Sequence, residues 1–281
     1  MEQKSQGHFV SLIIPVYRQE KTIIRDIRSI QKTLDKIRYD YEIIAVVDGH
    51  VDSSYKKLKK HAIPKVKVVS YFRNQGKAYA VRHGMQRARG DYVMFIDSGM
   101  EIDPNGISML LEHMEWYNAD VIVGSKRHPA SQVTYSNSRK ILSYGYYLFV
   151  KTLFGVNIHD TQAGIKVFRN KVLVKILPKL VEKKFAGDLE MLVAARSLGF
   201  TKIYEAPIRL NYRLSKVTSA ATMSSIRGIF QDTLAIYYRK NIRKQYQPDK
   251  KVAPRKTVNV HIKIASTKSR KKKKRAIRLA K

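Results

Sequence analysis

Three polar side chains stand where predicted buried strands end, and their types suit the binding of a polar ligand. They are Tyr17, Asp48 and Asp97, and each follows an apolar run. Such runs, without alternating polar residues, are typical of parallel strands that are buried on both faces. Because the carboxyl ends of parallel strands meet at one edge of a sheet, where ligands bind, we expect these side chains to converge.

Several common catalytic centres are excluded by the sequence. The chain has no cysteine, which rules out a thiol nucleophile, a disulfide scaffold and a cysteine-based zinc site. Its histidines His83, His113 and His159 show no metal-ligand spacing. The sequence contains neither a Gly-x-x-x-x-Gly-Lys-Ser/Thr loop nor a Gly-x-Ser-x-Gly turn, which argues against P-loop kinase and α/β-hydrolase chemistry.

The elements that must position these residues alternate between strand and helix in the first half of the chain. Predicted strands cover 9–16, 41–47, 66–71, 92–96 and 121–124. Predicted helices cover 23–37, 53–61, 76–89 and 105–117. This alternation predicts an α/β fold with a Rossmann-like, mostly parallel central sheet and helices on both faces.

The second half has a different pattern, with more helix. We predict helices at 137–154, 170–178, 186–198 and 220–243, and strands at 164–168 and 201–209. Apolar and polar residues alternate at 257–264, which predicts a short edge strand before a run of lysines. We therefore divide the chain into a main domain, an amphipathic helical extension and a basic tail, at 1–215, 216–249 and 250–281.

Positive charge dominates the chain and is concentrated at its end. The sequence has 55 Lys and Arg against 22 Asp and Glu, a formal net charge of +33. Residues 250–281 hold 14 basic residues and no acidic one, so residues 1–249 carry +19. This balance predicts attraction to anionic lipid, a phosphorylated substrate or nucleic acid. Nucleic acid is the least favoured, because no zinc finger or aromatic RNA-binding pattern is present.

Seven short motifs follow one another along the chain. They are Pro15–Glu20, Val47–Asp52, Asn74–Ala78, Ala88–Asp91, Phe95–Glu101, Asp160–Phe168 and Phe185–Glu190. Their order resembles that of the family-2 glycosyltransferases of the GT-A fold. The Asp-Thr-Gln-x-Gly-x-Lys-x-Phe element looks most like the polyprenyl-phosphate sugar transferases, such as dolichol-phosphate mannosyltransferase. The resemblance runs from about residue 8 to 215.

The resemblance implies a nucleotide-sugar donor bound with Mg²⁺ or Mn²⁺ at Asp97, which we expect to be both catalytic and metal-binding. A cation held by carboxylates neutralises the diphosphate as the glycosidic bond breaks. The family's Asp-x-Asp motif has Gly99 at its second position here, so we expect Glu101 to provide the other ligand. The residues expected at the donor nucleotide are Pro15, Tyr17, Glu20, Asp48 and Lys77.

The implied acceptor is a polyprenyl phosphate, whose phosphate is already a competent nucleophile. Its head requires positive charge, and the arginine fork suits phosphate best. We expect Lys126, Arg127 and Arg139 to bind this phosphate and Gln162 to shape the junction of donor and acceptor. Asp188 matches an acidic position that the family uses as a base or to orient the acceptor. The implied reaction is an inverting transfer of a hexose from a GDP- or UDP-sugar.

The lipid part of such an acceptor stays in a bilayer, so the enzyme must reach the membrane surface. No apolar run approaches the roughly 20 residues of a spanning helix, and the N-terminus lacks the apolar region of a signal peptide. We expect a cytoplasmic, peripheral protein without a transmembrane segment. The predicted anchors are the helix at 220–243, the tyrosines at 144, 146 and 147, and the basic tail, although the helix could equally pack on the enzyme body.

Other readings stay open. The acceptor could be a saccharide or a protein, in which case Asp188 must act as a true base. A GT-A-like scaffold without catalysis is also considered, because Val47 and Gly99 stand where the family has carboxylates. The sequence leaves open the sugar, the choice of UDP or GDP, the polyprenol and the oligomeric state.

Overall fold

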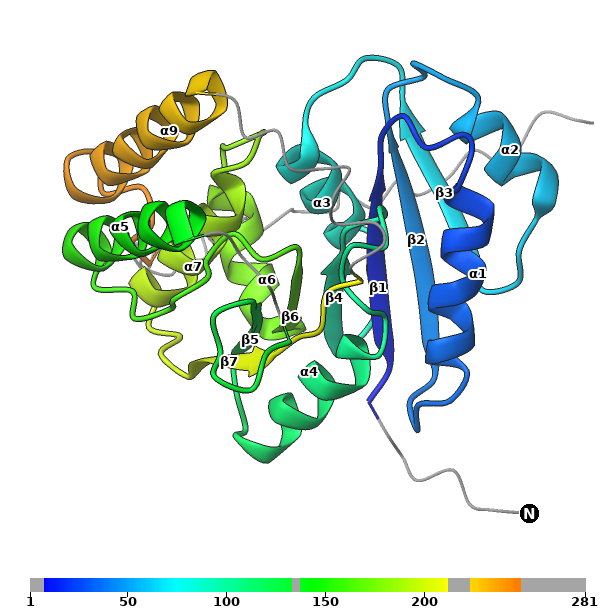
Figure 1. Ribbon diagram of the computed structural model, residues 1–281, viewed down its shortest axis with the longest axis horizontal. Helices are drawn as coiled ribbons and strands as arrows, with labels where there is room; N and C mark the ends of the chain where they lie inside the picture. The colour runs from blue at the N-terminus through cyan, green and yellow to red at the C-terminus, as the bar shows by residue number, and fades with distance from the viewer. Residues whose placement is uncertain (1–7, 133–136, 212–222, 249–281) are drawn as a thin grey trace, which may run out of the picture. The chain divides into compact units, whose positions relative to one another are not determined.

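In the part of the chain that the structure describes, seven strands form one sheet in the order β3-β2-β1-β4-β6-β5-β7 (Figure 1). The computed structural model describes residues 8–132, 137–211 and 223–248. The strands are β1 (Val10–Val16), β2 (Tyr41–Asp48), β3 (Val66–Tyr71), β4 (Tyr92–Ile96), β5 (Val121–Ser125), β6 (Ile165–Arg169) and β7 (Ile203–Pro207). The helices in these ranges are α1 (Ile23–Leu34), α2 (Ser54–His61), α3 (Lys77–Met85), α4 (Gly106–Trp116), α5 (Asn137–Phe154), α6 (Asn170–Ile176), the 3-10 turn η1 (Leu177–Lys179), α7 (Gly187–Ser197) and α9 (Met223–Asn241).

The central strands separate two apolar cores, one on each face of the sheet. Along β1, Leu12 and Ile14 pack into the core that includes α1 and α4, while Ile13 packs into the core that includes α3 and α7. Successive side chains of a strand point to opposite faces, so an unbroken apolar run fills both cores. This confirms the prediction of a mostly parallel sheet with helices on both faces.

One strand runs against the others and shapes the site. β6 is antiparallel to both β4 and β5, whereas the other paired strands are parallel. The register pairs Ile96 at the end of β4 with Ile165 at the start of β6. The loop that precedes β6 therefore lies beside the carboxyl end of β4, where Asp97 follows.

The predicted elements agree closely with the structure, with small differences at their ends. The helix predicted at 76–89 ends at Met85, and the strand predicted at 201–209 is confined to Ile203–Pro207. The strand predicted at 257–264 and the rest of the tail lie outside the described residues.

The amphipathic helix α9 packs on the body of the protein. It lies beside α5 in Figure 1 and contacts both α5 and α7. Thr233 and Ile236 on its inner side are fully buried. No helix in the described part of the chain combines the length and the apolar character that crossing a membrane requires.

Candidate active site

A cleft of about 850 Å³ opens at the carboxyl ends of β1, β2 and β4. The three predicted strand-end residues meet there. The site residues expected from the sequence that line this cleft are Pro15, Tyr17, Asp48, Lys77, Asp97 and Glu101.

A chain of alternating charges runs from Asp97 and Lys77 in the cleft lining to Asp188 and Lys166, which are buried behind it. The Lys77 Nζ lies 2.9 Å from Oδ1 and 3.0 Å from Oδ2 of Asp97, and 3.2 Å from Oδ2 of Asp188. The other carboxylate oxygen of Asp188 lies 2.8 Å from Nζ of Lys166. Lys166 is fully buried and also donates a hydrogen bond to the Ala163 carbonyl, at 2.7 Å. Both candidate catalytic carboxylates are thus joined by one lysine.

This chain of charges keeps Asp188 ionised. Burial acts to raise the pKa of Asp188, but the ammonium groups of Lys166 and Lys77 outweigh burial and hold that pKa below its ordinary value. Burial also acts to lower the pKa of Lys77, yet Asp188 and Asp97 together raise it. A carboxylate with a lowered pKa is a weak base, so Asp188 is suited to orienting neighbouring groups rather than to removing a proton at neutral pH.

Two glycines allow the charged groups to approach. A Cβ at Gly164 would lie 2.0 Å from Oδ2 of Asp97, while the Gly164 carbonyl accepts a hydrogen bond from the Asp97 amide at 2.9 Å. A Cβ at Gly187 would lie 2.2 Å from Cβ of Ala78, so the start of α7 can pack against α3. The glycines in the two downstream motifs therefore set the positions of Asp97 and Asp188.

Asp48 organises the loop that leads into α3. Its Oδ1 accepts a hydrogen bond from the Gln75 amide at 2.7 Å, and its Oδ2 accepts bonds from the Gly76 amide and the Asn74 side chain at 2.9 and 2.8 Å. The carboxylate is almost fully buried. Asp48 thus lines the cleft, but its hydrogen bonds serve first to fix the segment that carries Lys77.

The cleft offers the oxygen ligands that a hard divalent cation takes. Asp97 and Glu101 both line it, and so does Gln19, whose Oε1 is buried without a hydrogen-bond partner among the described residues. Within those residues no cluster of three or more His, Cys, Asp or Glu forms a metal site. Mg²⁺ characteristically takes one or two carboxylates and completes its shell with phosphate oxygens and water. The side chains present fit Mg²⁺ or Mn²⁺ bound together with a diphosphate.

Of the residues expected at the acceptor phosphate, Lys126 lies beside Glu101, one of the expected metal ligands. Lys126 Nζ is 3.5 Å from Oε1 of Glu101, and the Lys126 amide donates to Oδ2 of Asp160 at 3.0 Å. Arg127 donates to Oγ of Ser143 at 3.0 Å, which holds it against α5. Arg139 belongs to α5, at a position whose side chain is outside the described residues.

Gln162 is linked to both α5 and α9 through one tyrosine. Its Nε2 lies 3.4 Å from the hydroxyl of Tyr146 on α5, and that hydroxyl is 3.0 Å from Oγ1 of Thr233 on α9. Burial raises the pKa of Tyr146, so its hydroxyl stays protonated. The loop before β6 is therefore joined to α5 and α9 by a buried polar contact.

The structure places Glu20 apart from the residues that line the cleft. Its carboxylate accepts a hydrogen bond from the Ser53 amide at 2.9 Å, and its own amide donates to Asp52 at 3.0 Å. Its side chain therefore supports the loop before α2. Its position as the last residue of the first motif gave no sign of this local partner.

Two groups of residues at or behind the cleft were missed by sequence reasoning. Lys166 stands between the buried apolar residues Ile165 and Val167 of β6, a pattern that could have marked it, because buried lysines require a partner. The segment 183–185 lines the cleft opposite the strand ends. The Lys183 side chain donates a hydrogen bond to Oε1 of Gln75 at 3.1 Å. Because these two residues are far apart in the sequence, no local sequence pattern predicts this contact.

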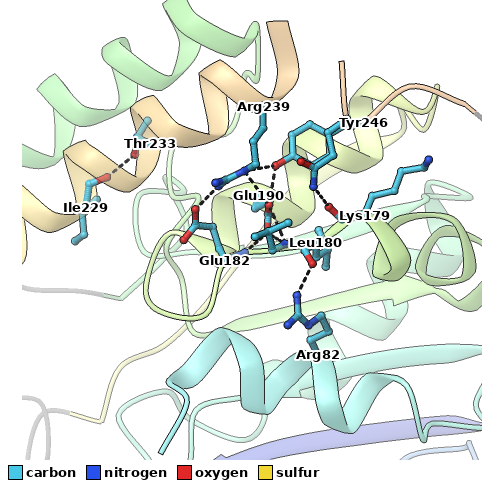
Figure 2. A network of polar contacts seen from close by, with 11 residues as sticks. Arg82, Lys179, Leu180, Glu182, Glu190, Ile229, Thr233, Arg239 and Tyr246 are labelled. Carbon is cyan, nitrogen blue, oxygen red and sulfur yellow. Dashed lines mark hydrogen bonds and ion pairs between the residues drawn. The ribbon is translucent and has the colours of Figure 1, made fainter. Parts of the chain in front are cut away.

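A buried polar network joins the residues directly before this segment, Val181 and Glu182, to the C-terminal part of the fold (Figure 2). Glu190 is fully buried and accepts hydrogen bonds from the Val181 and Glu182 amides and, at 2.6 Å, from the Tyr246 hydroxyl. Arg239 of α9 pairs with Glu182 and lies 3.6 Å from Glu190. Contacts from α9 and Tyr246 thus fix the residues that directly precede the cleft wall formed by 183–185.

The mixed sheet, with its cleft at the strand ends, has a GT-A-like fold. The fold is similar to that of glucosyl-3-phosphoglycerate synthase from Mycobacterium tuberculosis, solved with uridine diphosphate, with a TM-score of 0.63, 15% identity and coverage of 88% of this chain and 83% of that one. The same synthase solved with Mn²⁺, UDP-glucose and phosphoglyceric acid gives a TM-score of 0.61 at 16% identity, with coverage of 88% and 82%.

Residues 11–177 match the family described as glycosyl transferase family 2, and the chain belongs to this family. Among curated proteins it is similar to the dolichyl-phosphate beta-glucosyltransferase of Dictyostelium discoideum, with 27% identity, over 82% of this chain and 74% of that protein. The Drosophila melanogaster protein of the same name is 31% identical, over 67% of this chain and 63% of that protein.

Proposed function

We propose that this protein is an inverting glycosyltransferase that moves a hexose from a UDP- or GDP-sugar to a polyprenyl phosphate at a membrane surface. The observation that carries the proposal is the joined set of Asp97, Lys77 and Asp188, of which Asp97 and Lys77 line a cleft at the strand ends. The names of the curated relatives make glucose the first hexose and dolichyl phosphate the first acceptor to test.

The donor side uses carboxylates for a cation and lysines for phosphate. Asp97 and Glu101 would hold Mg²⁺ or Mn²⁺, which when bound supplies Lewis-acid stabilisation of the departing diphosphate. Lys77 and Lys183 both line the cleft, so their ammonium groups can bind donor phosphates from the protein side. Asp48 contributes by fixing the loop before α3, with Pro15 and Tyr17 beside it.

The acceptor side binds an anion that is already nucleophilic. An oxygen of the phosphate attacks the anomeric carbon on the face opposite the diphosphate, so one bond forms as the other breaks and the configuration inverts. Lys126 and Arg127, with Arg139, would bind the phosphate head, and Gln162 would lie at the junction. The phosphate needs no base, which agrees with the lowered pKa of Asp188. A saccharide or protein hydroxyl would need one, so the phosphate acceptor is favoured.

The lipid reaches the site from a membrane that the protein binds peripherally. The adjacent helices α5 and α9 expose large apolar side chains, namely Leu142, Tyr144, Leu148, Leu234 and Tyr238, and exposed Ile242 directly follows α9. Tyrosine is enriched at the level of lipid headgroups, and basic residues are attracted to the anionic cytoplasmic leaflet. We therefore place the enzyme on the cytoplasmic face, with the tail 250–281 as a second attachment.

The test is transfer of labelled sugar to lipid. Purified protein is incubated with labelled UDP-glucose or GDP-mannose, Mn²⁺ and a short polyprenyl phosphate, and label in the lipid extract is counted. We expect lipid-linked label that is lost in Asp97→Asn and retained in Asp103→Asn, which removes a charge from the same loop outside the cleft lining. Nucleotide binding without transfer to any acceptor would support the scaffold alternative, and transfer to free polyprenol or sugar would support a hydroxyl acceptor.

A further inference from the structure

The Lys77 ammonium lies where a metal ion would approach Asp97. It contacts both oxygens of that carboxylate, at 2.9 and 3.0 Å. A carboxylate that shares both oxygens with an ammonium group cannot coordinate a divalent cation with full strength until the ammonium moves. The donor-free protein therefore carries its own positive charge in the position that the proposed function gives to the metal.

We propose that Lys77 is an internal counter-ion that keeps the divalent cation off Asp97 until the donor arrives, and then moves to the donor's diphosphate. The metal then enters with the nucleotide sugar and not before it. This inference rests on the proposed function and adds a role for Lys77 in setting the order of binding.

The surrounding contacts allow this movement at low cost. When Lys77 leaves, Asp188 keeps its buried partner Lys166, at 2.8 Å. Asp97, whose side chain is 41% exposed, would exchange the ammonium for a divalent cation. Lys77 is the first residue of α3, and its flexible four-carbon stem lets the ammonium move without any movement of the helix.

The direction of the exchange follows from charge. A diphosphate concentrates more negative charge than a single carboxylate, so it competes effectively for the ammonium at close range. If the nucleotide increases metal affinity by withdrawing Lys77, then the metal must increase nucleotide affinity by the same factor. Lys77 would in this way reduce binding of free metal ions and favour binding of the metal–nucleotide complex.

The experiment measures Mn²⁺ affinity in the absence of nucleotide, by electron paramagnetic resonance of free Mn²⁺. We expect Lys77→Met to bind Mn²⁺ at least about tenfold more tightly than the native protein, or about 1.4 kcal/mol. Lys77→Arg should retain weak binding. Lys184→Met is the matched control, because Lys184 also lines the cleft but has no contact with Asp97 among the described residues, and the change should alter affinity by less than about threefold.

A double variant and a second readout separate the possible results. The double variant Lys77→Met with Asp97→Asn should lose the Mn²⁺ affinity that Lys77→Met gains, which assigns the gain to Asp97. Thermal unfolding followed by circular dichroism checks that each variant is folded. The inference alone is overturned if Lys77→Met and the native protein bind Mn²⁺ with equal affinity, while the native protein shows UDP-dependent Mn²⁺ binding and lipid transfer. Absence of Mn²⁺ binding under all conditions together with absence of lipid transfer overturns both the inference and the proposed function.

Discussion

Gly164→Ala is a sharp test of how the loop before β6 positions Asp97. The added Cβ would lie 2.0 Å from Oδ2 and 2.6 Å from Cγ of Asp97. Nonbonded heavy atoms settle near 3.5 Å, so the carboxylate or the loop must shift by about 1.5 Å. A misplacement of about 1 Å can reduce the rate about 100-fold, and forced overpacking costs about 1–3 kcal/mol of stability. We expect losses of this size in the kcat/KM of lipid transfer and in the free energy of unfolding.

The assay compares Gly164→Ala with Gly145→Ala. A Cβ at Gly145 on α5 would meet no described heavy atom within 4 Å beyond its chain neighbours and the nearby backbone of its own helix, so this control should retain activity and gain up to about 1 kcal/mol from helix propensity. Transfer is measured over a range of Mn²⁺ concentrations, and urea unfolding gives the stability. Activity of Gly164→Ala within about threefold of the native enzyme would refute the reasoning, because it would mean that Asp97 can move by this distance without loss.

Three further predictions follow from the same contacts. The nearest neighbour of a Cβ at Gly99 would be Gln19 Nε2 at 3.8 Å, so Gly99→Asp should fold. The added carboxylate should make the protein bind Mn²⁺ about tenfold more tightly in the presence of UDP. Unchanged Mn²⁺ affinity in a titration would contradict a metal site at this loop. The lowered pKa of Asp188 stabilises the folded state above about pH 4, the ordinary pKa of an aspartate, and this stabilisation is lost as the pH falls through the lower pKa of the folded state. The free energy of unfolding should therefore fall more steeply below about pH 4 in the native protein than in Asp188→Asn. Equal slopes in the two proteins would count against the lowered pKa. Tyr246→Phe should leave Glu190 without one donor and reduce stability by about 1–3 kcal/mol in urea unfolding, and an unchanged midpoint would show that the hydroxyl contributes nothing.

Much of the fold could be predicted because the information is local. The apolar runs of β1, β2 and β4 and the 3-and-4 spacing of α1 identify buried strands and an amphipathic helix from neighbouring residues alone. The meeting of Asp48 and Asp97 at one edge then follows from the general geometry of parallel sheets. The antiparallel direction of β6 could not be predicted in this way, because it depends on the path of the chain between β5 and β6.

The part of the site that was missed depends on contacts between distant segments. Lys166 and Lys77 lie 89 positions apart in the sequence, and each contacts Asp188 because β6, α3 and α7 meet in space. The position of Glu20 shows the opposite effect: a motif residue expected at the nucleotide is engaged by the amide of Ser53. Residue type predicts which groups can carry charge, whereas the partner that each charge meets is decided by tertiary packing.

The buried carboxylate of Glu190 limits how this sequence can vary. It accepts hydrogen bonds from two backbone amides of the segment before the cleft wall and from Tyr246, and it lies near Arg239. A neutral residue at position 190 would remove one of the carboxylates near the Arg239 guanidinium. Loss of Arg239 would in turn leave the buried Glu190 carboxylate without its nearby cation. These three positions should therefore change together among relatives or not at all, so that a tyrosine 56 residues downstream serves as a marker for an intact cleft wall.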